Sequence, residues 1–409
     1  MRKKRLGVIG VGSAGILALT HFCTWLGNDW DIVSIHNPDK PILGIGESTN
    51  GGFVGLLEKG THFALGHKED LKELDATLKF GSRFKNWREQ TWLNPLLDGN
   101  TAIHFNSFNF KDFAYKRLHK HWPQKFKVIE GDVKSLDNYP HKVVVDVDGT
   151  KEEFDWVIDC MGYPKDLSSY VQSNCTPVNR CIIHNVKDYD LEYETDHIAT
   201  PHGWMFGVPL ISRKTYGYLF NDNYTTVEEA TENMKEILGV DEVDGKEYLF
   251  RCYYTPKMIE GRICKCGNKA LFFEPLVANS IFLYILGVRM FFDHIMENVP
   301  AAELNARYVQ AIQEMEDVIS YYYQGGSIYE SKFWDYATKM TRERLQERMH
   351  FKNLWSQYSN LKSQGALHYG PTYAFAPLTW EIVDEQLGYD SFSSPGGPKL
   401  KNLEKMASA

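Results

Sequence analysis

A glycine-rich turn near the N-terminus constrains the fold of this chain more than any other feature. Residues 6–9 (LGVI) form a short apolar run, residues 10–15 (GVGSAG) follow the G-x-G-x-x-G pattern, and residues 16–22 (ILALTHF) have the composition of a buried helix. In a strand–turn–helix unit such glycines permit a tight turn and let a dinucleotide pyrophosphate approach the helix N-terminus. The sequence therefore predicts a Rossmann-like α/β domain, with the dinucleotide contacted by Gly10, Gly12, Ser13, Ala14 and Gly15.

The second strand of this unit, predicted over residues 31–35, ends without the acid that usually binds the ribose hydroxyls. His36 or Asn37 stands there instead. Either side chain can donate a hydrogen bond to the ribose, and either can equally lie in a solvated loop. We expect His36 to be the cofactor contact.

Further apolar segments return the chain to the same sheet. Residues 128–133 and 142–147 have the pattern of paired strands, and residues 157–162 form an apolar strand that ends in D-x-x-G. A domain for NAD alone needs no such excursion, so the pattern favours FAD. No second G-x-G-x-x-G follows, so we expect reducing equivalents to come from a separate protein. The predicted FAD contacts in these segments are Val133, Asp159 and Gly162.

Composition and charge exclude several other classes. The net charge of −8 argues against nonspecific nucleic-acid binding, which needs a basic face. The longest apolar stretch, residues 271–292, contains a proline and charged residues, so it predicts a buried core helix and not a membrane span. The seven cysteines are odd in number and scattered, which indicates no disulfide framework and favours a reducing cytoplasm. Cys264 and Cys266 lack a second pair at zinc spacing, so we expect no metal site.

A lysine in an aromatic setting is the second informative feature. Residues 77–87 (TLKFGSRFKNW) surround Lys79 with side chains that can keep its ammonium group from water, which disfavours the charged form. Residues 44–49 (GIGEST) precede it. Together the two segments resemble the flavin-dependent halogenase family, in which the first segment is a strap over the flavin. The second segment is similar to the family's K-x-G-x-x-F-x-N-W, with Lys79, Gly81, Phe84, Asn86 and Trp87 in register.

Three more segments extend this tryptophan-halogenase-like resemblance across most of the chain. Residues 203–210 (GWMFGVPL) resemble the family's W-x-W-x-I-P, with Phe206 in place of the second tryptophan. Residues 273–281 (FEPLVANSI) resemble its second flavin segment, E/D-P-L-E-S-T-G-I. Residues 331–334 (SKFW) resemble the F-W of its C-terminal helical part.

The resemblance implies the fold and its division. It implies an α/β, Rossmann-like FAD-binding fold of the glutathione-reductase and PHBH-like monooxygenase class. Residues 1–300 would form the FAD-binding core with an inserted, discontinuous substrate-side sheet, residues 301–395 a helical part that covers the substrate pocket, and residues 396–409 a loose tail. Within it, residues 104–110 alternate at strand period, as a core strand or a substrate-side strand, and residues 343–361 have the composition of a solvated helix.

The resemblance also implies roles for individual residues. Asn279 and Ser280 would bind a halide ion through their backbone amides, although Asn279 can also be a helix N-cap, and both roles can hold together. A wall between flavin and substrate would be formed by Trp204, Phe206 and Pro209. The further FAD contacts would be Gly46, Glu47, Ser48, Thr49, Glu274, Pro275 and Leu276.

The implied chemistry is halogenation. Reduced FAD, delivered by a separate flavin reductase, would react with oxygen and halide to give hypohalous acid, which reaches Lys79 and then an aromatic substrate. A dry path keeps this oxidant from water, and Lys79 would position it and donate a hydrogen bond near the leaving hydroxide. Lys79 is the one catalytic residue that the resemblance implies.

One departure from the family bears on the substrate. Val277 stands where tryptophan-halogenating members carry a glutamate, and valine can neither take nor give a proton. We therefore expect an electron-rich aromatic substrate such as a phenol, indole or aniline, not free tryptophan, and bromide or iodide in preference to chloride. Glu47 and Glu274 are open as bases or as structural groups.

Two other functions remain open at this point. A single-component FAD monooxygenase would use NAD(P)H directly, and a flavoprotein that has lost its halide chemistry would only bind FAD. No nucleic-acid or membrane partner is expected, and an oligomer is compatible with the sequence.

Overall fold

The structure is a computed structural model that describes residues 2–42, 44, 48–96, 101–348, 383–384 and 386–387. Gly46, Glu47 and the side chain of Val277 lie outside this description, as do the tail predicted at 396–409 and most of the chain after Arg348. None of the described helices is long and apolar enough to cross a membrane.

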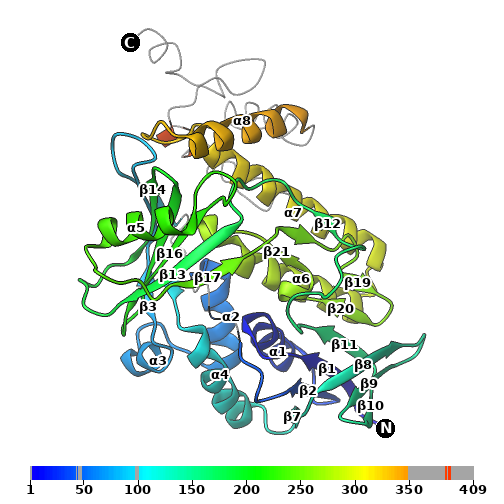
Figure 1. Cartoon of the computed structure of the whole chain (residues 1–409). Coiled ribbons are helices and arrows are strands. Elements are labelled where there is room, and N and C mark those ends of the chain that lie inside the picture. Colours follow the sequence, from blue (N-terminus) through cyan, green and yellow to red (C-terminus); the bar gives the residue numbers. More distant parts are fainter. Residues whose placement is uncertain are drawn as a thin grey trace, which may run out of the picture.

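The central sheet has six strands in the order β19-β20-β11-β1-β2-β7 (Figure 1). Its neighbours pair in parallel, except that β19 runs antiparallel to β20. Helix α1 (Ser13–Trp25) follows the first strand after a three-residue turn, which confirms the predicted strand–turn–helix unit. The strands are β1 (Lys4–Ile9), β2 (Trp30–His36), β7 (Phe126–Glu130), β11 (Trp156–Asp159), β19 (Ile259–Glu260) and β20 (Ile263–Lys265).

An antiparallel meander of β8 (Val133–Asn138), β9 (Val143–Val147) and β10 (Thr150–Phe154) packs on one face of this sheet. Valines of β9 share a buried cluster with Val33 and Ile35 of β2. The predicted pairing of residues 128–133 with residues 142–147 was wrong for residues 128–130. The chain up to Glu130 belongs to β7 and pairs with β2, and only from Val133 does it pair with β9, because the turn at Gly131 separates two strands.

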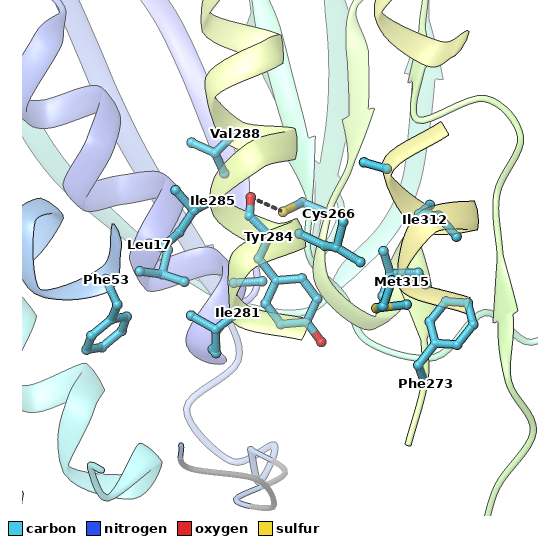
Figure 2. Packing of buried hydrophobic residues seen from close by; sticks show 14 of the residues in the cluster. Leu17, Phe53, Cys266, Phe273, Ile281, Tyr284, Ile285, Val288, Ile312 and Met315 are labelled. Atoms are coloured by element: carbon cyan, nitrogen blue, oxygen red, sulfur yellow. Dashed lines mark hydrogen bonds between the residues drawn. The ribbon is translucent and has the colours of Figure 1, made fainter. Parts of the chain in front are cut away.

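Helices cover the opposite face of the central sheet. Helix α1 is buried over residues 14–23, and an apolar helix of this kind has to be enclosed on all sides. It packs against α2 (Gly51–Thr61), α4 (Ser107–His121) and α6 (Asn279–Met296). Figure 2 shows α6 between α1 and α7 (Ala301–Tyr323), with Leu17 on one side and Met315 on the other.

A second sheet of seven strands, in the order β17-β13-β16-β15-β14-β4-β5, lies above the central sheet in Figure 1. Strands β4 and β14 pair in parallel, whereas the other neighbours are antiparallel. Helix α5 (Val227–Leu238) packs on one face, so β15 is buried along its whole length. The strands are β4 (Gly81–Lys85), β5 (Trp92–Pro95), β13 (Arg180–Val186), β14 (Glu194–Thr200), β15 (Gly203–Pro209), β16 (Lys214–Phe220) and β17 (Lys246–Leu249).

Smaller elements connect these layers. Strands β3 (Thr77–Lys79) and β6 (Ala102–His104) form an antiparallel ribbon beside the second sheet. The remaining elements are α3 (Lys68–Glu73), β12 (Val171–Gln172), β18 (Tyr253–Tyr254), η1 (Gly267–Lys269), β21 (Leu271–Phe272), η2 (Leu276–Ala278) and α8 (Lys332–Glu347).

Three predicted elements differ in the structure. Residues 104–110 are not one strand, because the Asn106 side chain accepts from the Phe108 amide and starts α4 at Ser107. Residues 271–292 are a helix only from Asn279, since Pro275 and a 3₁₀ turn precede it. The helix expected over residues 343–361 begins earlier, at Lys332, and residues after Arg348 in that range lie outside the described chain.

Candidate active site

The glycine turn after β1 forms a cradle in which Gly10 and Gly15 leave no room for a side chain. Gly10 has φ +94°, and a Cβ there would lie 2.4 Å from the carbonyl oxygen of Cys160. A Cβ on Gly15 would lie 2.0 Å from the Gly10 oxygen. A Cβ on Gly12 meets nothing within 4 Å, so this position opens onto space at the N-terminus of α1. With Ser13 and Ala14 in the first turn, the cradle fits a pyrophosphate.

His36 ends β2 with its side chain buried. Its Nδ1 lies 3.4 Å from the Tyr115 hydroxyl, and its Nε2 has no partner among the described residues. Burial, together with Lys111, lowers the pKa of His36. The side-chain amide of Asn37 instead donates to Asp132 Oδ1 across 3.1 Å. His36 is therefore the side chain that fits a ribose contact.

The other residues expected around the cofactor lie at the ends of neighbouring strands. Val133 starts β8 two residues after Gly131, whose amide donates to the His36 carbonyl across 2.9 Å. Asp159 ends β11 and accepts from the Met161 amide across 3.0 Å, so it shapes the turn before Gly162 (φ +81°). Burial raises the pKa of the Asp159 carboxyl.

Lys79 ends β3 with its side chain 3% exposed. Its Nζ donates to Ser48 Oγ across 2.9 Å and to the Thr49 carbonyl across 3.0 Å. Desolvation lowers the pKa of Lys79 to about 7. Thr49 in turn exchanges hydrogen bonds with the backbone of Ile103 in β6, at 2.7 and 3.1 Å. The end of the GIGEST segment is thus fixed to the ribbon that carries the lysine.

An aromatic stack joins β4, β14 and β15 of the second sheet. The ring of His197 lies between Phe84, at 4.6 Å and 11°, and Trp204, at 5.4 Å and 15°. Phe84 also stacks on Trp92 at 4.1 Å. Burial and Lys79 lower the pKa of His197 to about 3, so this ring is neutral.

The three expected wall residues all lie on β15 and are buried. Trp204 and Phe206 point to the same face because side chains alternate along a strand. The Phe206 ring covers the bare backbone of Gly217, where a Cβ would come within 2.2 Å of the ring. Pro209 lies at the end of β15, and its carbonyl accepts from the Thr77 hydroxyl across 2.7 Å. The wall and the lysine ribbon are therefore in direct contact.

Glu274 lies directly before the 3₁₀ turn that leads into α6 and is 2% exposed. Burial raises the pKa of Glu274 to about 7, although the hydrogen bond from the Tyr323 hydroxyl opposes this shift. Pro275 and Leu276 follow in the turn, and Leu276 is fully buried. Glu274 therefore borders the wall, where the resemblance expects flavin contacts.

Asn279 and Ser280 form the start of α6. Ala278, and not Asn279, is the N-cap, and it has φ +55°, so the left-handed backbone falls one residue before the expected halide site. The Asn279 side chain is 6% exposed, and its Nδ2 donor has no partner among the described residues. An unpaired donor at a helix N-terminus fits an anion.

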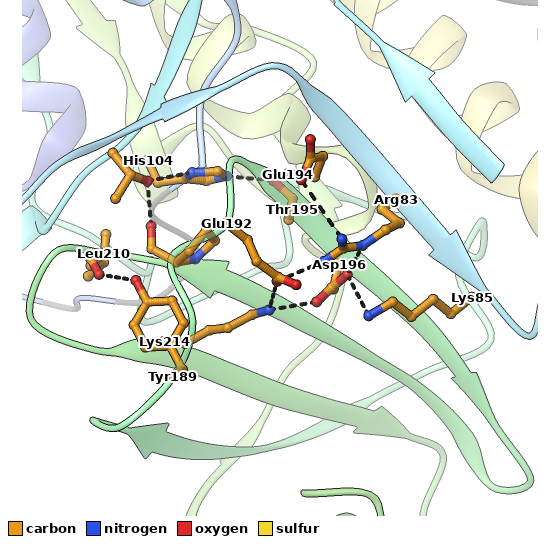
Figure 3. Close-up of polar contacts among 12 residues, drawn as sticks. Arg83, Lys85, His104, Tyr189, Glu192, Glu194, Thr195, Asp196, Leu210 and Lys214 are labelled. Carbon is orange, nitrogen blue, oxygen red and sulfur yellow. Dashed lines mark hydrogen bonds and ion pairs between the residues drawn. The ribbon is translucent and has the colours of Figure 1, made fainter. Parts of the chain in front are cut away.

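An ion-pair cluster centred on the buried Asp196 joins strands β4, β14 and β16 of the second sheet (Figure 3). Asp196 accepts from Arg83 at 2.7 Å, Lys85 at 3.2 Å and Lys214 at 2.7 Å. Arg83 and Lys214 also pair with Glu192. These cations lower the pKa of Asp196 to about 2 even though burial opposes ionisation. The cluster holds the strand of the lysine segment against the wall sheet.

Sequence reasoning did not find His197 and Thr195, and it placed His104 only within an aromatic segment. Thr195 and His197 lie on β14, where polar residues occupy buried strand positions. Their signal was the polar run at residues 194–197 (ETDH) at the start of this strand, because buried polar side chains require partners.

A largely parallel sheet with this glycine cradle at the end of its first strand defines a Rossmann-like dinucleotide-binding fold. The family model described as tryptophan halogenase matches residues 5–145 and 102–386. The chain therefore belongs to the tryptophan halogenase family. Its members are flavin-dependent halogenases, which act on aromatic substrates with reduced flavin from a separate reductase.

Individual relatives are distant in sequence and similar in fold. The tryptophan 6-halogenase ThaL of Streptomyces albogriseolus is 22% identical over 81% of this chain and 78% of its own. The tryptophan 7-halogenase RebH of Lentzea aerocolonigenes is 22% identical over 76% and 73%. A tryptophan halogenase from Shewanella frigidimarina superposes with a TM-score of 0.79 at 18% identity, covering 99% of this chain and 92% of that one. A flavin-dependent halogenase from Xanthomonas campestris gives 0.80 at 17% identity, with 95% and 89% covered.

Proposed function

We propose that this chain halogenates an electron-rich aromatic substrate through Lys79, using hypohalous acid made at the flavin. The observation that carries the proposal is the state of Lys79. It is buried, its pKa is lowered to about 7, and both of its described hydrogen bonds run to oxygen acceptors. Such an amine can accept a halogen when neutral or donate to a leaving hydroxide when protonated.

FAD would be held by the glycine cradle, His36 and the residues around Glu274. Reduced FAD, when bound, supplies the electrons with which oxygen and halide give hypohalous acid. The wall of Trp204 and Phe206 would exclude water between the cofactor and Lys79, since both side chains are buried. We divide the chain accordingly into a core over residues 1–300 and a covering helical part from residue 301.

The halide would bind at the start of α6, where the unpaired Asn279 amide adds a donor to the helix N-terminus. We propose bromide or iodide as the preferred ion because each is oxidised more readily than chloride. Competition among the three halides, followed by product mass, tests this preference. Chloride as the dominant incorporated halogen would contradict it.

The substrate class follows from the surroundings of Lys79. Among the described residues, burial is what lowers its pKa, no carboxylate contributes to the shift, and no acid pairs with the amine. A site without a neighbouring base relies on a ring that is already activated, as in phenols, indoles and anilines. The relatives named for tryptophan halogenation are therefore a guide to the chemistry and not to the substrate of this chain.

The proposal is tested with purified protein, FAD, a flavin reductase with NADH, and each halide in turn. A panel of phenols, indoles and anilines is screened by mass spectrometry. We expect halide-dependent products, and we expect Lys79→Met to lose them while FAD binding is retained. Hydroxylated products without halide, or NADPH oxidation by the protein alone, would favour the single-component monooxygenase instead.

A further inference from the structure

Lys79 lies at one end of a buried chain of hydrogen bonds that reaches the wall strand. The side chains of this chain are each at most 4% exposed. Figure 3 shows its centre, where His104 contacts Thr195. Lys79 Nζ lies 2.9 Å from Ser48 Oγ, which lies 2.9 Å from Thr195 Oγ1. Thr195 Oγ1 lies 2.9 Å from Nε2 of His104, and Nδ1 of the same ring lies 3.0 Å from Thr77 Oγ1. Thr77 Oγ1 ends the chain at the Pro209 carbonyl, 2.7 Å away.

The far end of the chain fixes the position of every proton in it. The Pro209 carbonyl can only accept, so the Thr77 hydroxyl must donate to it. Thr77 has no second proton, so it accepts from Nδ1 of His104, which must carry the ring proton. In a neutral imidazole the other nitrogen is then an acceptor.

The same reasoning continues to the lysine. His104 Nε2 accepts from Thr195, whose oxygen therefore accepts from Ser48. The Ser48 proton is committed to Thr195, so Ser48 can only accept from Lys79. The direction of donation is thus set over the whole chain by one backbone carbonyl, provided that His104 is neutral.

Several charged groups surround His104. Lys79 lies on the paired strand β3, Lys214 on β16 and Asp196 on β14, and the Leu78 carbonyl is a further hydrogen-bond acceptor for the ring. Burial comes first among the causes that lower the pKa of His104 well below its usual value, followed by Lys79 and Lys214, and Asp196 opposes them only in part. A neutral ring at His104 agrees with the proton positions deduced from the geometry.

The direction of donation decides which valences of the Lys79 nitrogen are free. A neutral amine has two N–H groups and one lone pair, and the two groups are used by Ser48 and the Thr49 carbonyl. The lone pair, or the third N–H of the ammonium form, remains for the oxidant. If Ser48 lost its acceptor, its hydroxyl could turn and donate to the Lys79 nitrogen, which would occupy the lone pair.

We propose that neutral His104, protonated on Nδ1, is a positioning residue that acts through Thr195 and Ser48 to keep the reactive valence of Lys79 free for halogen transfer. The inference rests on the proposed function. It adds a reason for the buried histidine and threonine that the implied role of Lys79 alone does not provide.

The test replaces one link by an isostere. Thr195→Val keeps the shape of the threonine and removes its hydroxyl, and Thr195→Ser restores the hydroxyl. Thr200→Val is a matched control on the same strand, because the Thr200 hydroxyl bonds Tyr218 and takes no part in the chain. If Thr195→Val fails to fold, Thr77→Val and Thr77→Ser cut and restore the chain at its other end.

We expect Thr195→Val to lower kcat for aromatic halogenation by about five- to tenfold, the size of one lost hydrogen bond, with KM unchanged. The pKa read from the kcat–pH profile should fall below that of the wild type, since a serine donor favours the neutral amine. Thr195→Ser should restore both quantities, and Thr200→Val should leave both unchanged.

Hypohalous acid trapped by a small scavenger separates this inference from the proposed function. If the wild type forms neither oxidant nor product, the proposed function fails. If the wild type halogenates and Thr195→Val matches it in kcat and pH profile, only the role of His104 fails. If Thr195→Val lowers oxidant formation as much as product, the chain acts on the flavin side, and the inference is overturned.

Discussion

The Tyr323 hydroxyl donates to Oε2 of Glu274 across 2.7 Å and accepts from Nε1 of Trp204 across 2.6 Å. Tyrosine has one proton, so both of these directions are fixed. The contact joins helix α7, the acid before α6 and the wall strand β15 at one buried point. The orientation of the wall tryptophan therefore depends on a carboxyl group whose charge changes near neutral pH.

Glu274→Gln should change how stability depends on pH. The pKa of Glu274 is raised to about 7 in the folded protein from 4.5, so the folded state binds more protons between these values. Wild-type stability therefore falls as pH rises across this window. The glutamine still accepts from Tyr323 but cannot ionise, so its free energy of unfolding relative to wild type should rise by about 2 kcal/mol between pH 4 and pH 8. Urea unfolding at both values checks this, and an equal difference at each would contradict it.

Lys79→Met should show the opposite pH dependence. The pKa of Lys79 is lowered to about 7 from 10.5, so the unfolded chain binds more protons between these values, and wild-type stability rises with pH there. Methionine has no such dependence, so the variant should gain about 4 kcal/mol over wild type near pH 7 and lose most of this advantage toward pH 10. Lys120→Met, at an exposed position on α4, is the control and should show no such trend. A pH-independent difference for Lys79→Met would mean that the amine is not desolvated.

Two glycines of the cradle should separate folding from cofactor binding. Gly12→Ala places a methyl group in space that no described protein atom fills, so stability should be retained while FAD affinity falls by at least about tenfold. Gly10→Ala forces a side chain against the Cys160 carbonyl at φ +94° and should cost about 1–3 kcal/mol. Thermal unfolding and flavin-fluorescence titration measure the two effects. Wild-type FAD affinity in a folded Gly12→Ala protein would disprove the cradle.

Trp204→Phe should uncouple oxidant formation from halogenation. The variant loses the indole donor to Tyr323, which should cost about 1 kcal/mol of stability, and the ring loses its fixed orientation in the wall. More hypohalous acid should then reach a scavenger for each halogenated product formed. Trp334→Phe is the matched control, because it loses a buried indole bond to the Thr200 carbonyl on a different element. Equal product-to-oxidant ratios in the two variants would argue against a wall at Trp204.

Features that depend on neighbouring residues could be predicted from the sequence, whereas contacts between distant segments could not. The turn at Gly10–Gly15 and the burial of Lys79 depend on neighbouring residues, so their patterns were sufficient. The hydrogen-bond chain that leads from Lys79 was not predictable, because Ser48 and Thr195 are 147 positions apart and meet only in the folded chain. The alternation over residues 104–110 suggested a strand, yet the hydrogen bond that the Asn106 side chain accepts from the Phe108 amide at the helix start outweighed it.

The parallel pairing of β4 with β14 has a consequence for how the protein is made. Arg83 and Asp196 are bonded across this pair although they lie 113 positions apart, and most of the strands between them belong to other sheets. During synthesis the segment after Lys79 leaves the ribosome long before the strand that will hold it. Until β14 is complete, Arg83 lacks its Asp196 partner, so β4 and the ribbon of β3 and β6 that carries Lys79 have to wait for a strand made more than a hundred residues later.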